Sequence, residues 1–162
     1  MFDLEGMPPY LDELEKVYLW GVQVYGDHPS SYKAALAGPG ADGDQQGWEQ
    51  FLQIARGILE KYGDIPFVHW HRYECTKLNM YIQRFGDPDG TAARVRTNLV
   101  DLWKITKRSV VLPISSYSLK EVERYIGFQR QRPEANGEWA MAKYIEAIET
   151  ADHQRRCELM SE

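Results

Sequence analysis

Apolar residues near the N-terminus follow the alternation and clustering typical of strands. Residues 1–6 form a short apolar run that contains Asp3 and Glu5, and residues 16–25 form a longer run rich in β-branched and aromatic side chains. Both runs predict strands. A third, shorter strand is expected at residues 32–37, before a Gly-rich loop. Three strands ahead of the first helix predict a meander.

Most of the remaining chain follows a helical period. Apolar residues recur at spacings of three and four, which predicts helices at residues 44–62, 73–85, 91–108, 119–126 and 138–149. The last helix either ends at residue 149 or continues through Met160. Between the first two helices, the apolar run 65–70 predicts a strand laid parallel to an earlier one.

Length and composition indicate one globular domain over residues 1–162. The chain is 43% hydrophobic and 27% charged, and its length suffices to bury a single core. No apolar run approaches a membrane span and no leader precedes the first strand, so we expect a cytoplasmic protein without membrane contact. Cys75 and Cys157 form no C-x-x-C pair, which suits a reducing compartment.

The net charge of -5 argues against a nucleic-acid partner, but the charge is unevenly distributed. Residues 1–28 hold six acids against one lysine, whereas residues 91–132 hold nine basic residues against three acids. This division is expected if the acids gather a metal and a basic surface holds a phosphate backbone. The alternative is that the basic residues form an ordinary solvated face.

Asp3 and Glu5 stand two residues apart in the first predicted strand. Side chains at i and i+2 of a strand leave the same face, so the two carboxylates are expected to point together. A divalent cation held by oxygen ligands would turn their repulsion into coordination. The alternative is a frayed terminal strand whose acids face water.

Glu74 is the second informative acid. It lies four residues before Leu78 and seven before Tyr81, which places it on the buried face of its helix, in the first turn. The helix N-terminus would favour its charge, which is a sufficient structural explanation. The functional alternative directs Glu74 over the sheet towards Asp3 and Glu5, so that three acids form a two-metal site.

These elements resemble the RNase H-like fold of the DEDD 3′-to-5′ exonuclease superfamily: a strand with D-x-E, a long second strand, and a strand leading into H-x-x-Y-E at a helix start. Four blocks resemble more closely the RNase H-like nuclease domains that accompany RecB-type nuclease or helicase modules in bacteria, namely residues 2–6, 68–74, 99–102 and 116–123. The resemblance implies an α/β fold with a mixed β-sheet, an antiparallel meander followed by a parallel strand, flanked by helices.

The resemblance also implies metal-dependent hydrolysis of nucleic acid, as a 3′-to-5′ exonuclease on DNA rather than RNA. The cofactor would be Mg²⁺ or Mn²⁺, with two ions if the site is complete. Asp3 and Glu5 match the first acidic motif, and Glu74 stands where the superfamily usually has Asp. Asp101 matches a recurrent V-D-L block. In a continuous helix it would share a solvated or DNA-facing side with Lys104. We therefore interpret it as a structural residue or as one that contacts the metal ligands rather than the metal.

The last acidic motif of the superfamily is an Asp preceded by a Tyr or His. Here His153 and Glu158 would occupy these two positions, His153 as the general base and Glu158 as the last acid. The related domains predict instead a Tyr-Asn-x-x-Asp helix beyond Glu162, so we expect the chain to be a fragment of a longer protein, one that can include the RecB-type module, and an incomplete fragment would be inactive. Lys120 would hold phosphates, and His71 or Tyr117 would stack on a terminal base.

The rival hypothesis is a catalytically silent RNase H-like module that binds nucleic acid or a partner protein. The Glu in the second motif and the uncertain third motif favour it. His69 and His71 suggest a zinc pair, but no further ligands stand at suitable spacing. The sequence has no Gly-rich phosphate loop and no G-x-S-x-G elbow, so other hydrolase classes lack support.

Overall fold

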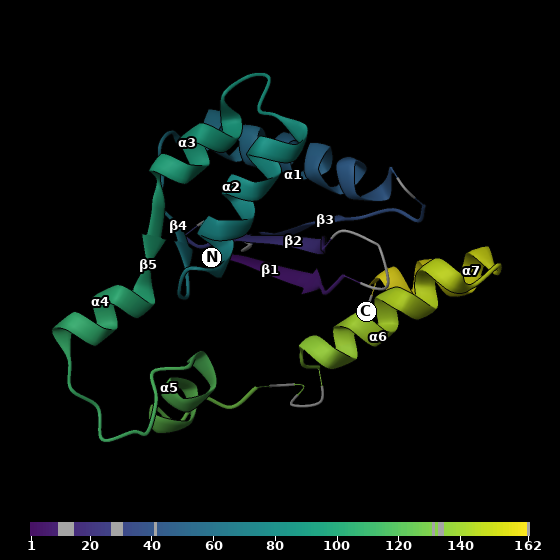
Figure 1. Ribbon diagram of the computed structural model, residues 1–162. Coiled ribbons are helices and arrows are strands. Elements are labelled where there is room, and N and C mark those ends of the chain that lie inside the picture. The colour runs from purple at the N-terminus through teal and green to yellow at the C-terminus, as the bar shows by residue number, and fades with distance from the viewer. Residues whose placement is uncertain (10–14, 27–30, 41, 131, 133–134, 162) are drawn as a thin grey trace. The chain divides into compact units, whose positions relative to one another are not determined.

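A computed structural model describes residues 1–9, 15–26, 31–40, 42–130, 132 and 135–161 (Figure 1). Its strands are β1 (Phe2–Met7), β2 (Lys16–Val24), β3 (Ser31–Leu36), β4 (Phe67–His69) and β5 (Leu99–Asp101). Its helices are α1 (Gly43–Tyr62), α2 (Tyr73–Phe85), α3 (Thr91–Thr97), α4 (Leu102–Ser109), α5 (Leu119–Tyr125), α6 (Gly137–Glu149) and α7 (His153–Ser161). The predicted α/β class, with antiparallel and parallel strand pairs, is confirmed.

The first three strands form one sheet in the order β1-β2-β3, as the meander prediction required. β2 and β3 are antiparallel, with Leu19 opposite Leu36. Along β1 burial alternates: Phe2 is buried, whereas Asp3 is exposed and Glu5 is half-buried. The two carboxylates therefore leave the same face of the strand.

The other two strands, β4 and β5, pair in parallel, with Phe67 opposite Leu99. Two predictions were wrong here. Residues 91–108 do not form one helix, because β5 separates α3 from α4. The strand at residues 65–70 is shorter than expected, and within the described part of the chain it pairs with the later β5 rather than with an earlier strand. The backbone N–H of Phe67 donates to the carbonyl of Asn98 at 2.8 Å, so strand pairing overrides the helical period.

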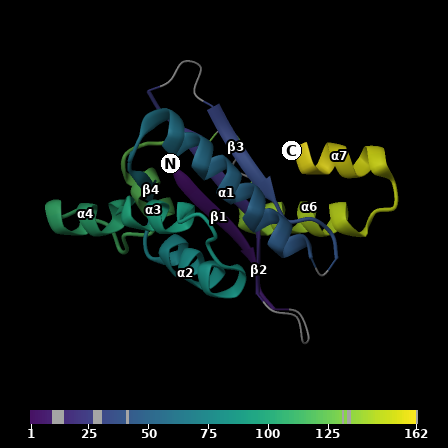
Figure 2. The same ribbon diagram turned by 90° about the horizontal axis from the view of Figure 1, so that it is seen from above.

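The C-terminal segment is two helices rather than one. α6 ends at Glu149, where Thr150 adopts an extended conformation, and the guanidinium of Arg156 donates to the carbonyls of Ala147 and Thr150. The carboxylate of Asp152 then accepts from the backbone N–H groups at the start of α7. Continuation of one helix through Met160 was therefore wrong. α6 and α7 lie side by side in both views (Figures 1 and 2).

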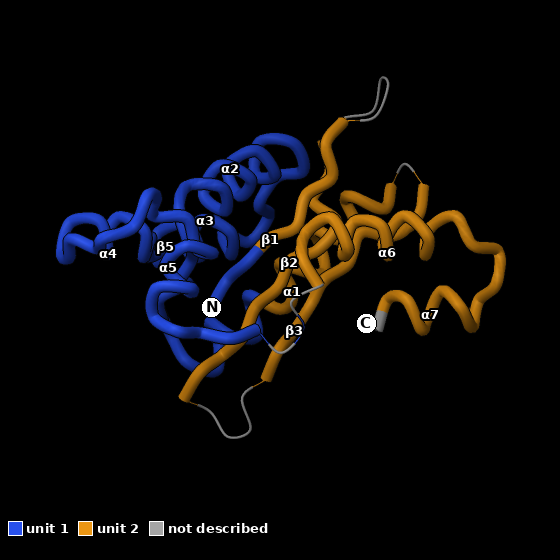
Figure 3. Tube along the Cα trace, turned by 90° about the horizontal axis from the view of Figure 1, so that it is seen from below, with its two compact units in different colours: residues 1–3, 55–133 blue, residues 4–54, 134–162 orange. Residues whose placement is uncertain are grey.

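The chain divides into two compact units (Figure 3). The first unit contains residues 1–3 and 55–133, and the second contains residues 4–54 and 134–162. A single domain over residues 1–162 stays a prediction.

The core of the second unit is aromatic. Trp20 on β2 is fully buried, stacks on Phe51 of α1 with ring centroids 4.7 Å apart, and lies 5.2 Å from the ring of Trp48. Nearby on the same strand, Tyr18 stacks on Tyr144 of α6, also at 4.7 Å. These contacts bury α1 and α6 against the sheet through large ring surfaces.

The first unit is built around α2, α3 and the β4–β5 pair. Its buried side chains include Phe67, Leu78 and Val95, and the ring of Phe2 meets Phe67 edge-on at 6.1 Å. The Asp87 carboxylate caps α3 by accepting from the backbone N–H groups of its first turn. In the described part of the chain, no helix has both the length and the apolar character needed to cross a membrane.

Gly43, at the turn between β3 and α1, has no room for a side chain. The carbonyl of Gly43 accepts from the backbone N–H of Gly38 at 3.1 Å, and a Cβ on Gly43 would collide with the Gly38 carbonyl oxygen. We expect Gly43→Ala to lower the free energy of unfolding by about 2 kcal/mol or more, because the backbone must shift. In the same helix a Cβ on Gly57 meets open space, so Gly57→Ala should raise stability by about 0.5–1 kcal/mol. Urea titration of both variants measures the difference, and equal effects would contradict this packing.

Candidate functional site

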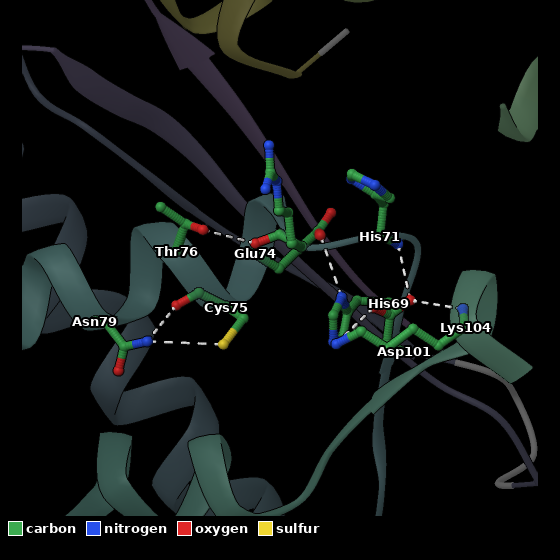
Figure 4. A network of polar contacts seen from close by, with 9 residues as sticks. His69, His71, Glu74, Cys75, Thr76, Asn79, Asp101 and Lys104 are labelled. Atoms are coloured by element: carbon green, nitrogen blue, oxygen red, sulfur yellow. Dashed lines mark hydrogen bonds and ion pairs between the residues drawn. The ribbon is translucent and has the colours of Figure 1, made fainter.

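A buried polar contact joins the end of β4 to the start of α2. His69 is the last residue of β4, and Glu74 lies in the first turn of α2. Nδ1 of His69 lies 3.3 Å from Oε2 of Glu74, and the two side chains are only 3% and 6% exposed (Figure 4). A buried carboxylate without a partner is costly. His69 therefore stabilises Glu74. The zinc-pair hypothesis did not predict this role.

Asp101 stands at the end of β5 and links two other segments. Its Oδ1 accepts from the backbone N–H of His71 at 3.1 Å and from that of Lys104 at 3.3 Å, so it caps α4 (Figure 4). The Lys104 ammonium lies 3.4 Å from Oδ2, which is buried and makes no hydrogen bond. Asp101 does not lie within a helix, so the expected shared helical face with Lys104 was wrong.

The surroundings of Asp101 act on its charge in opposite directions. Burial favours the neutral acid, but the backbone and side chain of Lys104, the backbone N–H of His71 and the nearby His69 favour the carboxylate. Together these groups hold the pKa of Asp101 below its usual value. The site therefore keeps this carboxylate charged down to acidic pH.

His71 has an unusual backbone conformation. Its φ is +71°, and it is the one non-glycine residue with a positive φ in the described part of the chain. Such a conformation is sparsely populated for residues with a side chain. The bond from its N–H to Asp101 holds it there, and its ring turns away from Asp101 (Figure 4). That ring meets the Trp103 ring edge-on at 4.6 Å.

The parallel pairing of β4 and β5 explains why these residues gather. The carboxyl ends of parallel strands lie at the same edge of a sheet, which is where ligands commonly bind in such sheets. His69 is opposite Asp101 in the register. The chain leaving β4 reaches His71 and Glu74, and the chain leaving β5 reaches Trp103, so all five residues lie at one end of the pair.

The β1 carboxylates lie in different compact units, Asp3 in the first and Glu5 in the second. Within the second unit, Oε2 of Glu5 would lie 3.1 Å from a Cβ placed on Gly137, the first residue of α6. The Glu5 carboxylate therefore faces the N-terminal turn of α6, where the helix dipole favours a negative charge. Gly137 leaves the space that this approach needs.

Oxygen donors from one strand face suit a hard divalent ion, and Asp3 and Glu5 provide such a pair. Within the part of the chain that the structure describes, no three or more His, Cys, Asp or Glu residues are grouped so as to hold a metal ion. The pair thus fits the donor chemistry of Mg²⁺ or Mn²⁺ without forming a closed ligand set. The three-acid site of Asp3, Glu5 and Glu74 stays a prediction.

The remaining predicted site residues occupy several helices and loops. His153 and Glu158 are exposed on α7 of the second unit, where Glu158 pairs with Arg155 at 3.7 Å. The hydroxyl of Tyr117 donates to the Val110 carbonyl and accepts from the Leu112 N–H, which fixes its loop. Lys120 is exposed on α5. Their proposed catalytic and binding roles stay predictions.

A cavity of about 220 Å³ lies in the second unit, between the sheet and α6. Leu36, Trp139 and Tyr144 are among its walls, and its lining among the described residues is mostly apolar and aromatic.

Comparison with known proteins identifies the family. The model of a family of the RNase H superfamily matches residues 1–161. The chain belongs to the RNase H superfamily. No curated protein matches, and no solved structure matches. RNase H superfamily nucleases hydrolyse nucleic acids and typically use divalent metal ions, so membership supports nuclease-like chemistry at this coarse level.

The buried pair in this RNase H superfamily member yields a stability prediction. His69→Ala leaves the Glu74 carboxylate buried without its partner, so we expect a loss of about 3 kcal/mol in the free energy of unfolding. Glu74→Gln removes the charge and keeps an amide near His69, so its loss should be smaller, about 1 kcal/mol. Urea titration at pH 7 compares them. A loss from His69→Ala no larger than that from Glu74→Gln would contradict the stabilising role of His69.

Asp101 yields a pH prediction. Because its pKa is lowered in the folded state, its charge contributes stability above the unfolded value of about 3.9, and this contribution is lost as the pH falls through the folded pKa. Asp101→Asn keeps a capping oxygen without the charge. The stability difference between wild type and Asp101→Asn should be constant from about pH 5 to 7 and shrink below about pH 4. Urea titrations across this range measure it, and a difference unchanged at pH 3 would refute the assignment.

Proposed function

We propose that the chain is a metal-dependent nuclease that hydrolyses phosphodiester bonds of DNA from the 3′ end, in the manner of the DEDD superfamily. The observation that carries the proposal is the carboxylate pair Asp3 and Glu5 on one face of β1 in a member of the RNase H superfamily. A strand places such a pair at a fixed spacing, which supports a site whose ion positions must be held rigidly.

The proposed roles follow from the chemistry of each side chain. Asp3 and Glu5 hold the ion and Glu74 completes the ligands, with its orientation fixed by His69. When bound, Mg²⁺ or Mn²⁺ would supply a Lewis acid that activates water and offsets the charge developing on the leaving 3′ oxygen. His153 and Glu158 serve as general base and last acid.

The substrate strand is held by separate groups. His71 and Tyr117 stack on a terminal base, and Lys120 binds a phosphate. A RecB-type nuclease or helicase module of the same longer protein is the proposed partner.

The second candidate is a catalytically silent module that binds nucleic acid or a partner protein. Two observations favour it: Glu74 is buried against His69, and the described residues contain no group of three metal-ligating side chains. Binding without hydrolysis distinguishes this module from the nuclease.

The test is a hydrolysis assay with a 5′-labelled single-stranded oligonucleotide, in DNA and RNA forms, with Mn²⁺ or Mg²⁺. We expect a ladder of shortened DNA products, blocked by a 3′ phosphorothioate, and a loss of at least about a hundredfold in Asp3→Asn because a metal ligand is gone. Asp64→Asn is the matched control, since Asp64 is an exposed acid paired with Arg94 in the first unit.

Calorimetric titration of Mn²⁺ gives a readout independent of activity. Asp3→Asn should abolish binding that Asp64→Asn retains. Strand binding without hydrolysis, together with Mn²⁺ binding that Asp3→Asn leaves unchanged, would overturn the nuclease proposal in favour of the silent module.

A further inference from the structure

The helix α4 carries none of the residues proposed to act in catalysis or substrate binding. None of its residues is buried, and Leu102 and Ile105 are 36% and 49% exposed. It carries Lys104, Lys107 and Arg108 and no acid. An exposed helix that combines apolar and cationic side chains is expected to have a ligand or partner.

Trp103 is the aromatic centre of this surface. The Lys107 ammonium lies 4.7 Å from the centroid of its ring, one helical turn away, and the His71 ring meets it edge-on at 4.6 Å. Asp101 fixes both sides of the cluster, because its carboxylate accepts from the His71 N–H and caps the helix that carries Trp103. The three side chains are thus preorganised before any ligand arrives.

Two other basic residues of the first unit are already engaged. Arg94 forms an ion pair with Asp64 at 2.8 Å, and Arg124 pairs with Glu121 at 2.7 Å. By contrast, Lys107 and Arg108 have no carboxylate partner among the residues that the structure describes. Lys107 and Arg108 of α4 are therefore available to an anionic partner, beside the aromatic pair.

We propose that His71, Trp103 and Lys107 form a platform that binds an unpaired nucleic-acid strand. This deepens, and rests on, the proposed nuclease function. Cations of α4 complement the phosphates, and the aromatic rings offer stacking surfaces that bases in a duplex cannot reach. A nucleic-acid strand supplies both phosphates for Lys107 and Arg108 and bases for the aromatic rings, whereas an acidic peptide would match the cations alone.

The position of the platform suits an incoming strand end. It lies at the carboxyl ends of β4 and β5, the same edge that carries Glu74 and its partner His69. A base between His71 and Trp103 would thus lie at the edge where β4 leads into the loop before Glu74. The platform adds Trp103 and Lys107 to the substrate-binding residues.

The test is fluorescence anisotropy with a labelled 15-nucleotide DNA strand and its duplex, in the presence of EDTA. Chelation removes hydrolysis, so this measurement is independent of the metal site. We expect the single strand to bind more tightly than the duplex. Trp103→Ala and His71→Gly should each weaken strand binding about tenfold, because each removes a stacking ring. Glycine accepts the positive φ of residue 71, so His71→Gly removes the ring without backbone strain.

Lys107→Ala has a matched control on α6. Lys143 lies 5.7 Å over the Trp139 ring, which reproduces the i, i+4 Trp-Lys pairing on a helix of the second unit. Lys107→Ala should weaken binding and reduce the slope of log affinity against log salt by about one, whereas Lys143→Ala should change neither. Thermal melting of each variant checks that folding is retained.

The outcomes separate the two proposals. Strand binding that Trp103→Ala and His71→Gly leave unchanged, in folded variants, overturns the platform. Equal affinity for strand and duplex overturns its preference for unpaired bases. Self-association that Trp103→Ala abolishes, without strand binding, shows instead an interface between copies. Binding lost in these variants but retained in Asp3→Asn supports the platform, even where the hydrolysis assay fails.

Discussion

One carboxylate oxygen of Asp101 accepts from the backbone amides of His71 and Lys104. This contact joins the loop after β4 to the first turn of α4, two segments that are far apart in the sequence. Without it, the positive φ of His71 would lack a compensating bond, and α4 would lose its N-terminal cap. The positions of Glu74, His71 and Trp103 relative to one another therefore depend on this one acid and on the parallel strand pair that carries it.

The strands and helices with strong periodicity were predictable from sequence. The long aromatic run of β2 and the repeated apolar spacing of α1 and α2 favour one structure each, because a two-residue or 3.6-residue period matches only one element. The break in residues 91–108 was not predictable. Leu99 and Val100 fit the helical period locally, and only the hydrogen bonds to β4 make them a strand. A three-residue strand carries too little sequence to be distinguished from a helix.

The candidate site was predictable in its acids but not in their partners. Two carboxylates at i and i+2 identify a shared strand face, and an acid on the apolar side of a helix identifies Glu74. Nothing in the spacing of His69 and Glu74 shows that they meet, since the turn of residues 70–72 between β4 and α2 determines it. The zinc-pair hypothesis considered His69 beside His71, but β4 ends at His69, and the positive φ of His71 directs its ring towards Trp103. Trp103 had a sequence signal, the i, i+4 pairing with Lys107, which was visible only as part of a wrongly continuous helix.

A net charge of -5 does not oppose a surface for nucleic acid, because the field at a surface depends on nearby charges. At physiological ionic strength, charges beyond about 8 Å are largely screened. Asp64 and Glu121 neutralise arginines locally, and the Glu5 carboxylate faces the N-terminus of α6. On α4, Asp101 pairs with Lys104 at the N-terminus, but Lys107 and Arg108 have no such partner among the described residues, so a phosphate near these two would meet a positive potential despite the acidic total. Local pairing, rather than composition, thus determines which part of this chain an anionic strand approaches.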